Sequence, residues 1–137
     1  MATANSVPRE LNWVEKRAAC SARQIFAELV RGIDNDVATI NAVKKIPESQ
    51  RFTAEMLSDD STLVVGQIGI PSRTRIKIGI VGDRIETSGG SDQPSLSASV
   101  TLNNEGRCML KLEDGTELEQ WQFRKKALQK LFFGDEG

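Results

Sequence analysis

Residues 8–45 read PRELNWVEKRAACSARQIFAELVRGIDNDVATINAVKK. An apolar residue returns every three or four positions along this stretch, which is the spacing of one face of an α-helix. That stripe comprises Leu11, Val14, Ala18, Ala22, Ile25, Leu29, Ile33, Val37, Ile40 and Val43. We therefore expect one long amphipathic helix. It begins either at Pro8, a favourable first helical residue, or about a turn later, where Asn12 and Glu15 can form a capping box.

The expected helix is long for the size of the chain. At ~1.5 Å per residue it would extend roughly 50 Å, whereas a compact domain of this length has a radius of gyration near ~14 Å. The helix must therefore overhang its domain, bend, or lie against a second subunit. Gly32 is the expected position of a bend, because glycine costs about 1 kcal/mol relative to alanine inside a helix. Pro47 ends the element.

After Pro47 the apolar period changes from 3.6 to 2, which indicates β-strands. The expected strands are Arg51–Leu57, Leu63–Ile70, Arg73–Val81, a short strand around Ile85, Leu96–Leu102 and Cys108–Leu112. A C-terminal helix follows, capped by Thr116 and Glu119, although a short strand through Glu117–Gln120 is an alternative at its start. Its expected apolar face consists of Leu118, Trp121, Leu128, Leu131 and Phe132.

These elements predict an α+β fold. A long N-terminal helix would be followed by an antiparallel meander of five or six strands, and a C-terminal helix would pack on the same sheet face. The 137 residues are expected to form a single domain, residues 1–137, of which residues 1–7 form a disordered tail.

The bulk composition narrows the functional classes. Eighteen Lys and Arg balance nineteen Asp and Glu, and this balance argues against a nucleic-acid partner, since nucleic-acid-binding domains usually carry a basic excess. No apolar run is long enough to span a bilayer. Cys20 and Cys108 match no zinc or haem spacing. We interpret them as reduced thiols of a cytoplasmic protein, with a structural disulfide as the alternative.

The chain contains no histidine and no tyrosine. Histidine is the commonest general acid–base and the commonest metal ligand. We therefore expect a protein that is not an enzyme and that has no cofactor, no metal site and no catalytic residues.

Two surfaces are candidates for binding. Trp13, Cys20 and Ala27 recur every seven residues on the side of the helix opposite the main stripe, which predicts a second contact surface, for the C-terminal helix or for a partner subunit. The alternative is a solvated face with one partly exposed tryptophan.

The second surface is basic. Arg73, Arg75 and Lys77 alternate with the apolar residues of one strand, so they share its outer face and could bind phosphate or carboxylate groups. The alternative is an ordinary solvated sheet surface, because water-facing strands commonly carry Lys and Arg.

The overlong helix and the exposed-phase Trp13 favour a non-enzymatic protein-interaction module that self-associates, with a homodimer or another protein as the partner. The alternative is a binder of a small anionic or lipid-like ligand held between the sheet and the helices. An enzyme that uses carboxylates or lysine ranks third.

Overall fold

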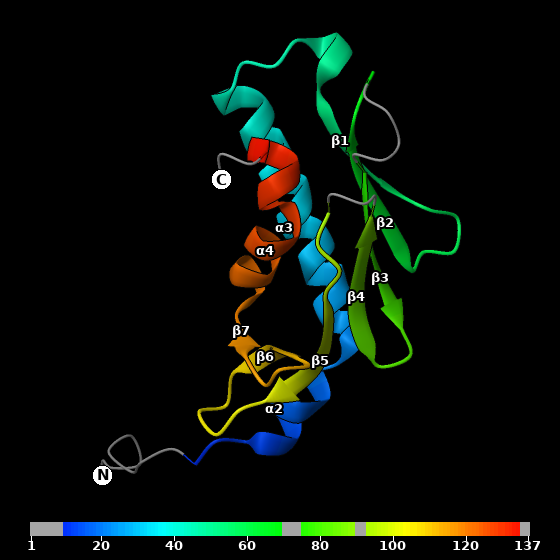
Figure 1. Ribbon diagram of the computed structural model, residues 1–137. Coiled ribbons are helices and arrows are strands. Elements are labelled where there is room, and N and C mark those ends of the chain that lie inside the picture. The colour runs from blue at the N-terminus through cyan, green and yellow to red at the C-terminus, as the bar shows by residue number, and fades with distance from the viewer. Residues whose placement is uncertain (1–9, 70–74, 90–92, 135–137) are drawn as a thin grey trace.

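The computed structural model describes residues 10–69, 75–89 and 93–134 (Figure 1). The expected tail, residues 1–7, and the candidate residue Arg73 lie outside these ranges. The elements are the helices α2 (Trp13–Ala19), α3 (Ala22–Val43) and α4 (Gln120–Phe133), the short 3₁₀ helix η1 (Glu48–Gln50), and the strands β1 (Phe52–Met56), β2 (Thr62–Gln67), β3 (Ile76–Val81), β4 (Arg84–Gly89), β5 (Ser97–Leu102), β6 (Cys108–Leu112) and β7 (Glu117–Leu118).

The α+β prediction is confirmed. The strands form one antiparallel seven-stranded sheet in which the spatial order β1 to β7 is the order along the chain. Helices α3 and α4 lie side by side over one sheet face (Figure 1). The strand beyond the expected five or six is β7, where Leu118 pairs with Leu110, so the alternative of a short strand before the C-terminal helix is the correct one.

The prediction of one continuous N-terminal helix is wrong. Helix α2 ends at Ala19, and Ser21 adopts an extended conformation, from which its hydroxyl accepts a hydrogen bond from the backbone N–H of Gln24 at 3.1 Å. A serine in this position caps a new helix, so α3 begins at Ala22 in the middle of the apolar stripe. The start at Asn12 is the correct alternative, because its side chain accepts a hydrogen bond from the backbone of Glu15.

The break lies at Cys20–Ser21 and not at Gly32, since α3 runs from Ala22 to Val43 as one helix. Its apolar stripe packs against the inner face of the sheet. Alternate strand residues point to that face: Ile76 and Ile78 are buried, whereas Lys77 between them is exposed. The largest fully buried side chains are Phe123, Leu29, Ile33, Leu63, Ile76, Ile78, Ile85, Leu110, Leu128, Val65 and Cys20.

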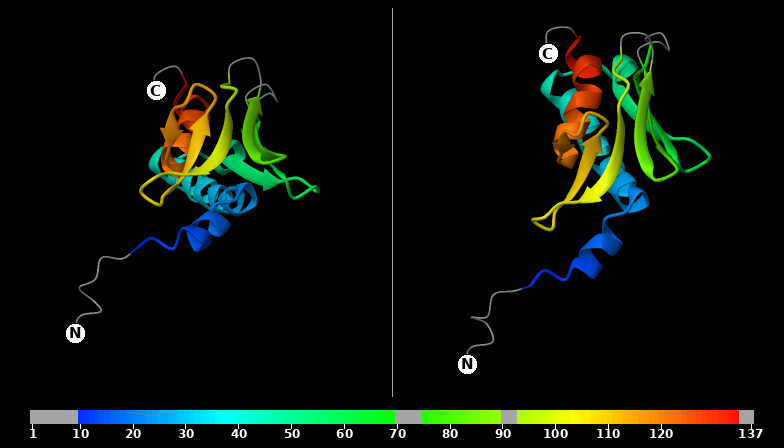
Figure 2. Two further views of the ribbon diagram at one scale, coloured as in Figure 1. Left: turned by 90° about the horizontal axis from the view of Figure 1, so that it is seen from below. Right: turned by 60° about the horizontal axis from the view of Figure 1, so that its bottom comes forward.

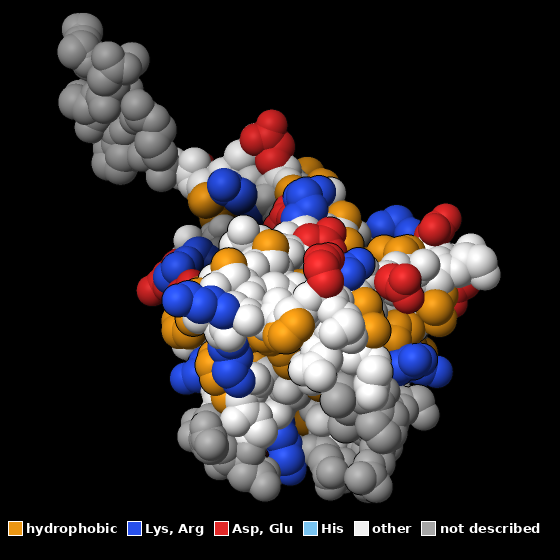
Figure 3. Space-filling model, turned by 90° about the horizontal axis from the view of Figure 1, so that it is seen from above, with side chains coloured by type: hydrophobic (Ala, Val, Ile, Leu, Met, Phe, Trp, Pro, Cys, Tyr) orange, Lys and Arg blue, Asp and Glu red, His pale blue; other side chains and the backbone are white. Residues whose placement is uncertain are grey.

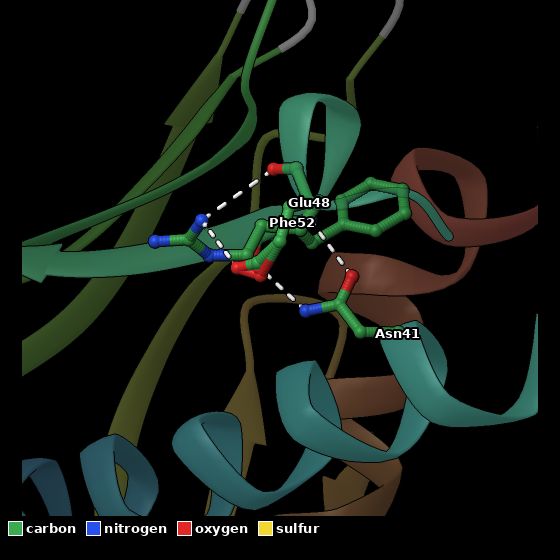
Figure 4. Close-up of polar contacts among 4 residues, drawn as sticks. Asn41, Glu48 and Phe52 are labelled. Carbon is green, nitrogen blue, oxygen red and sulfur yellow. Dashed lines mark hydrogen bonds and ion pairs between the residues drawn. The ribbon is translucent and has the colours of Figure 1, made fainter. Parts of the chain in front are cut away.

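The last turn of α3 is fixed to the first strand by Asn41 (Figure 4). Its side-chain amide accepts a hydrogen bond from the backbone N–H of Phe52 at 2.8 Å and donates one to the carbonyl of the same residue at 3.0 Å. The side chain therefore replaces a neighbouring strand at this point of the sheet edge. Arg51 beside it pairs with Glu48 of η1 at 3.1 Å.

The interpretation of the cysteines as reduced thiols is also wrong. Cys20 and Cys108 form a disulfide, with their Cα atoms 5.4 Å apart. The helix break places Cys20 at the end of α2, where it is 1% exposed and faces the first residue of β6. A pairing across 88 residues carries no local sequence motif, so only the fold brings the two sulfurs together.

Helix α4 buries part of the expected face, because Leu128 and Phe132 lie in the core as predicted, but Trp121 does not. Strand β7 takes up Glu117 and Leu118, and Glu119 caps the helix in a reciprocal pair with Gln122. The helix consequently buries Phe123, Ala127, Leu128 and Phe132. Trp121, expected in the core, is 54% exposed.

The disulfide yields a first prediction. The double variant Cys20→Ser/Cys108→Ser should unfold at lower urea concentration, with a free energy of unfolding reduced by about 4–5 kcal/mol, the loop-closure value for a ring of this length. The wild-type chain unfolded in the presence of a dithiol reductant is the control and should match the variant. An unchanged urea midpoint in the variant would show that the bond contributes nothing to stability.

The two aromatic residues near the start of α4 form a matched pair for a second prediction. Phe123→Ala should reduce the free energy of unfolding by about 3–5 kcal/mol, because it empties a fully buried site. Trp121→Ala should change it by about 0.5 kcal/mol or less, as expected for an exposed position. Equal losses in urea denaturation would contradict the packing described for α4.

Candidate functional site

A groove of about 500 Å³ runs between α3 and α4. The two helices run parallel, since Glu28 accepts a hydrogen bond from Gln120 at one end and Lys44 donates one to the carbonyl of Phe132 at the other. These two contacts lie at opposite ends of the helix pair, and the groove is bounded by both helices. Its lining residues are Asp36, Thr39, Ile40, Val43, Trp121, Arg124, Lys125, Leu128, Gln129, Phe132 and Phe133.

The groove is apolar at its floor and at its rim. Ile40, Leu128 and Phe132, which line it, also belong to the core. At the rim, Val43 is 70% exposed, Trp121 is 54% exposed and Phe133 is 46% exposed. Exposed apolar side chains scattered singly are ordinary on a protein surface, but a group of large ones around one hollow marks a binding surface.

One wall is fixed by a partly buried ion pair. The Nε of Arg124 donates a hydrogen bond to the carboxylate of Asp36 at 2.7 Å. The guanidinium lies directly over Gly32, where an added Cβ would be 2.5 Å from its Nη1. Glycine at this position therefore allows the arginine to cross α3 and reach its partner, which explains why a residue unfavourable to helices occurs inside α3.

Both ends of the helix pair are held by polar contacts. Hydrogen bonds from Gln24 and then from Gln120 lower the pKa of Glu28, because they stabilise the ionised carboxylate. At the other end the ammonium of Lys44 is 5.3 Å from the ring centroid of Phe133, within the range of a cation–π contact. The groove therefore lies on a helix pair whose ends are both fixed.

The first sequence-based surface is not one face in the structure. Trp13 is 65% exposed on α2 and Ala27 is exposed on α3, but Cys20 between them is buried in the disulfide. The seven-residue spacing assumed an unbroken helix, and the break at Ser21 rotates the two segments relative to each other. Cys20 is thus a crosslink and not part of a contact surface, while Trp13 stays a candidate.

The basic surface is partly described. Arg75 and Lys77 are both exposed on the outer sheet face, and Lys77 lies between Val64 and Ser88 of the neighbouring strands. Gly66 leaves room for Arg75, whose Cγ would be 2.8 Å from a Cβ at that glycine. Anion binding here stays a prediction, because Arg73 lies outside the described residues.

The remaining charges form no single field. Arg84 and Arg107, on other strands or turns, pair with Glu113 and Glu119 at 3.9 Å and 3.0 Å. Viewed from the end that carries η1 and the last turn of α4, charges of both signs are interspersed with hydrophobic side chains (Figure 3). Within residues 10–69, 75–89 and 93–134, no three Cys, Asp or Glu side chains are grouped as metal ligands would be.

Comparison of the chain with protein-family models, with curated proteins and with solved structures found no match. In the described part of the chain, no helix combines the length and the apolar character needed to cross a membrane.

Sequence reasoning did not identify the groove. Val43 belongs to the apolar stripe and was expected in the core, and Phe133 was not singled out. The available signal was the length of the stripe, which continues to the last residue of α3 beyond the buried Ile40. Apolar residues that extend past the covered part of a helix indicate a surface with an unmet partner.

The contact between Gly32 and Arg124 yields a third prediction. In an Arg124→Met background, Gly32→Ala should raise the free energy of unfolding by about 1 kcal/mol through helix propensity. In the wild-type background the same change should give no gain, because the new methyl group displaces the guanidinium from Asp36. Urea denaturation of the four chains measures the coupling, and identical effects in both backgrounds would rule out the proposed contact.

Proposed function

We propose that the protein is a non-enzymatic interaction module that self-associates through the groove between α3 and α4. The observation that carries this proposal is the group formed by Val43, Trp121 and Phe133, large apolar side chains exposed around one apolar hollow. Aromatic residues at such positions dominate the binding energy of protein interfaces.

The setting of the groove supports a protein partner. Its walls are two helices tied together at Glu28 and at Lys44, so little ordering is required when a partner binds. Two of the charged residues that line it, Asp36 and Arg124, already pair with each other, so covering this pair leaves neither of the two charges unpaired. A second copy of the chain is the partner that is always present.

A second candidate is an anionic ligand with an acyl chain. The apolar lining together with Arg124 and Lys125 favours it. The space between sheet and helices, where such a ligand was expected from the sequence, is filled by core side chains such as Leu29, Ile78 and Phe123. The ligand would instead lie in the groove between the helices.

The cytoplasmic location stays a prediction from the sequence. The Cys20–Cys108 disulfide favours a compartment that is not permanently reducing, because cytosolic thiols are normally kept reduced. The disulfide also removes both cysteines as candidates for thiol chemistry while it is intact.

The fourth prediction tests the groove. Wild-type protein at tens of micromolar should be a dimer in light scattering, and Val43→Glu or Trp121→Glu should shift it to a monomer that still unfolds in one cooperative transition. Its melting temperature should be lower than that of the dimer, because dimerisation stabilises the folded chain by mass action. Val81→Glu is the matched control, since Val81 is 56% exposed, close to the 54% of Trp121, but lies on the β3–β4 hairpin, and it should leave the dimer intact. Native mass spectrometry of the same samples reports any retained acyl ligand. A monomeric wild type that carries such a ligand would favour the second candidate.

A further inference from the structure

We infer that the segment that fills the groove is helix α2 of a second copy, and that two chains exchange this helix reciprocally. The inference rests on the proposed self-association and names its contact. It starts from a helix that contributes nothing to its own core: no residue of α2 is buried. Trp13 is 65% exposed and Val14 is 58% exposed, and α2 projects from the rest of the molecule (Figure 2).

The helix is nevertheless held in a defined position. The disulfide fixes its last turn to β6, and the guanidinium of Arg17 donates a hydrogen bond to the carbonyl of Cys20 at 3.1 Å. Near its start, Leu11 packs against the turn before β6, where a Cβ at Gly106 would be 2.6 Å from its Cδ2. A helix that exposes Trp13 and Val14 and is anchored in this way is already ordered for binding, which lowers the entropic cost of association.

The helix is unsuited to the groove of its own chain. Sixteen positions separate Cys20 from Asp36, the first α3 residue of the groove, and this corresponds to about 24 Å along the helix axis. Trp13 lies farther away still, on a segment that leads away from the body of the protein (Figure 2). We call helix α2, with its exposed Trp13 and Val14, the arm. The groove and the arm lie at different ends of α3, so only another chain can bring the two surfaces together.

The apolar area available for burial indicates whether the dimer contains one arm–groove contact or two. A buried tryptophan or phenylalanine removes roughly 150–250 Å² from water. From the exposed fractions of Trp13, Val14, Val43, Trp121 and Phe133, one arm in one groove buries on the order of 500 Å² of apolar side chain, and specific interfaces bury about 1,000 Å² or more in total. Two reciprocal contacts reach that value, and a two-fold axis relates them.

The fifth prediction uses complementation between two defective chains. Trp13→Glu disrupts the binding surface of the arm, and Val43→Glu disrupts that of the groove. Each variant alone should dimerise at least 100-fold more weakly than the wild type. In the equimolar mixture, the Val43→Glu chain supplies an intact arm and the Trp13→Glu chain an intact groove. One of the two contacts is restored, so the mixture should form a heterodimer at least tenfold more tightly than either variant alone. Sedimentation velocity up to several hundred micromolar measures all three samples, and melting curves verify that each variant is folded.

The outcomes separate this inference from the proposed function. A monomeric wild type overturns self-association itself. A Trp13→Glu variant that dimerises normally while Val43→Glu is monomeric preserves the groove but overturns α2 as its occupant. Two monomeric variants whose mixture shows no recovery overturn the exchange, because both residues would then lie in one symmetric surface. Val81→Glu alone is the control for a charge introduced at an exposed valine outside the groove, and it should dimerise as the wild type does.

Discussion

The fold depends on the two hydrogen bonds between the amide of Asn41 and the backbone of Phe52. Each strand pairs only with its neighbours along the chain, so the position of β1 relative to α3 sets the position of every later strand. A shift of one residue would turn Phe52 outward and its neighbour inward, and the error would pass to the whole sheet. The apolar stripe of α3 contributes to the buried core, and the two hydrogen bonds of Asn41 align α3 with β1.

The elements that depend on periodicity could be predicted from the sequence. The alternation around Ile76 and Ile78 locates β3 and its inner face, and a series of such patterns predicts an antiparallel meander of five or six strands. The seventh, β7, is only two residues long, which is too short to show a period. Features created by tertiary contact could not be predicted. The break at Ser21 did have a local signal, because Ser21 and Gln24 have the S-x-x-Q spacing of a helix start. The apolar stripe passes through Ser21 without interruption, however, and this periodicity predicted one continuous helix. The pairing of Cys20 with Cys108 appears only once β6 is in place.

The candidate site was missed for a related reason. Val43 is indistinguishable from Ile40 in the sequence, yet one is 70% exposed and the other is buried, because α4 covers only part of α3. Which part is covered depends on where α4 begins, and β7 determines that. Gly32 could not be interpreted correctly from the sequence either. A glycine inside a helix predicts a bend, whereas in the structure it makes room for the side chain of Arg124. The exposed phase of Trp13 could be read from the sequence, whereas the groove that we propose as its binding surface can be located only in the fold.

The disulfide divides the molecule topologically. It closes residues 20–108 into a covalent ring that contains α3 and the strands β1 to β5. A protease that cuts one peptide bond inside this ring, such as in the exposed turn at Asp59 and Asp60, releases no fragment, because both halves stay joined through the sulfurs. Helices α2 and α4 lie outside the ring, as its two tails. A nicked chain therefore gains only the mass of one water molecule until it is reduced, whereas a cut in either tail leaves that helix with no covalent link to the ring.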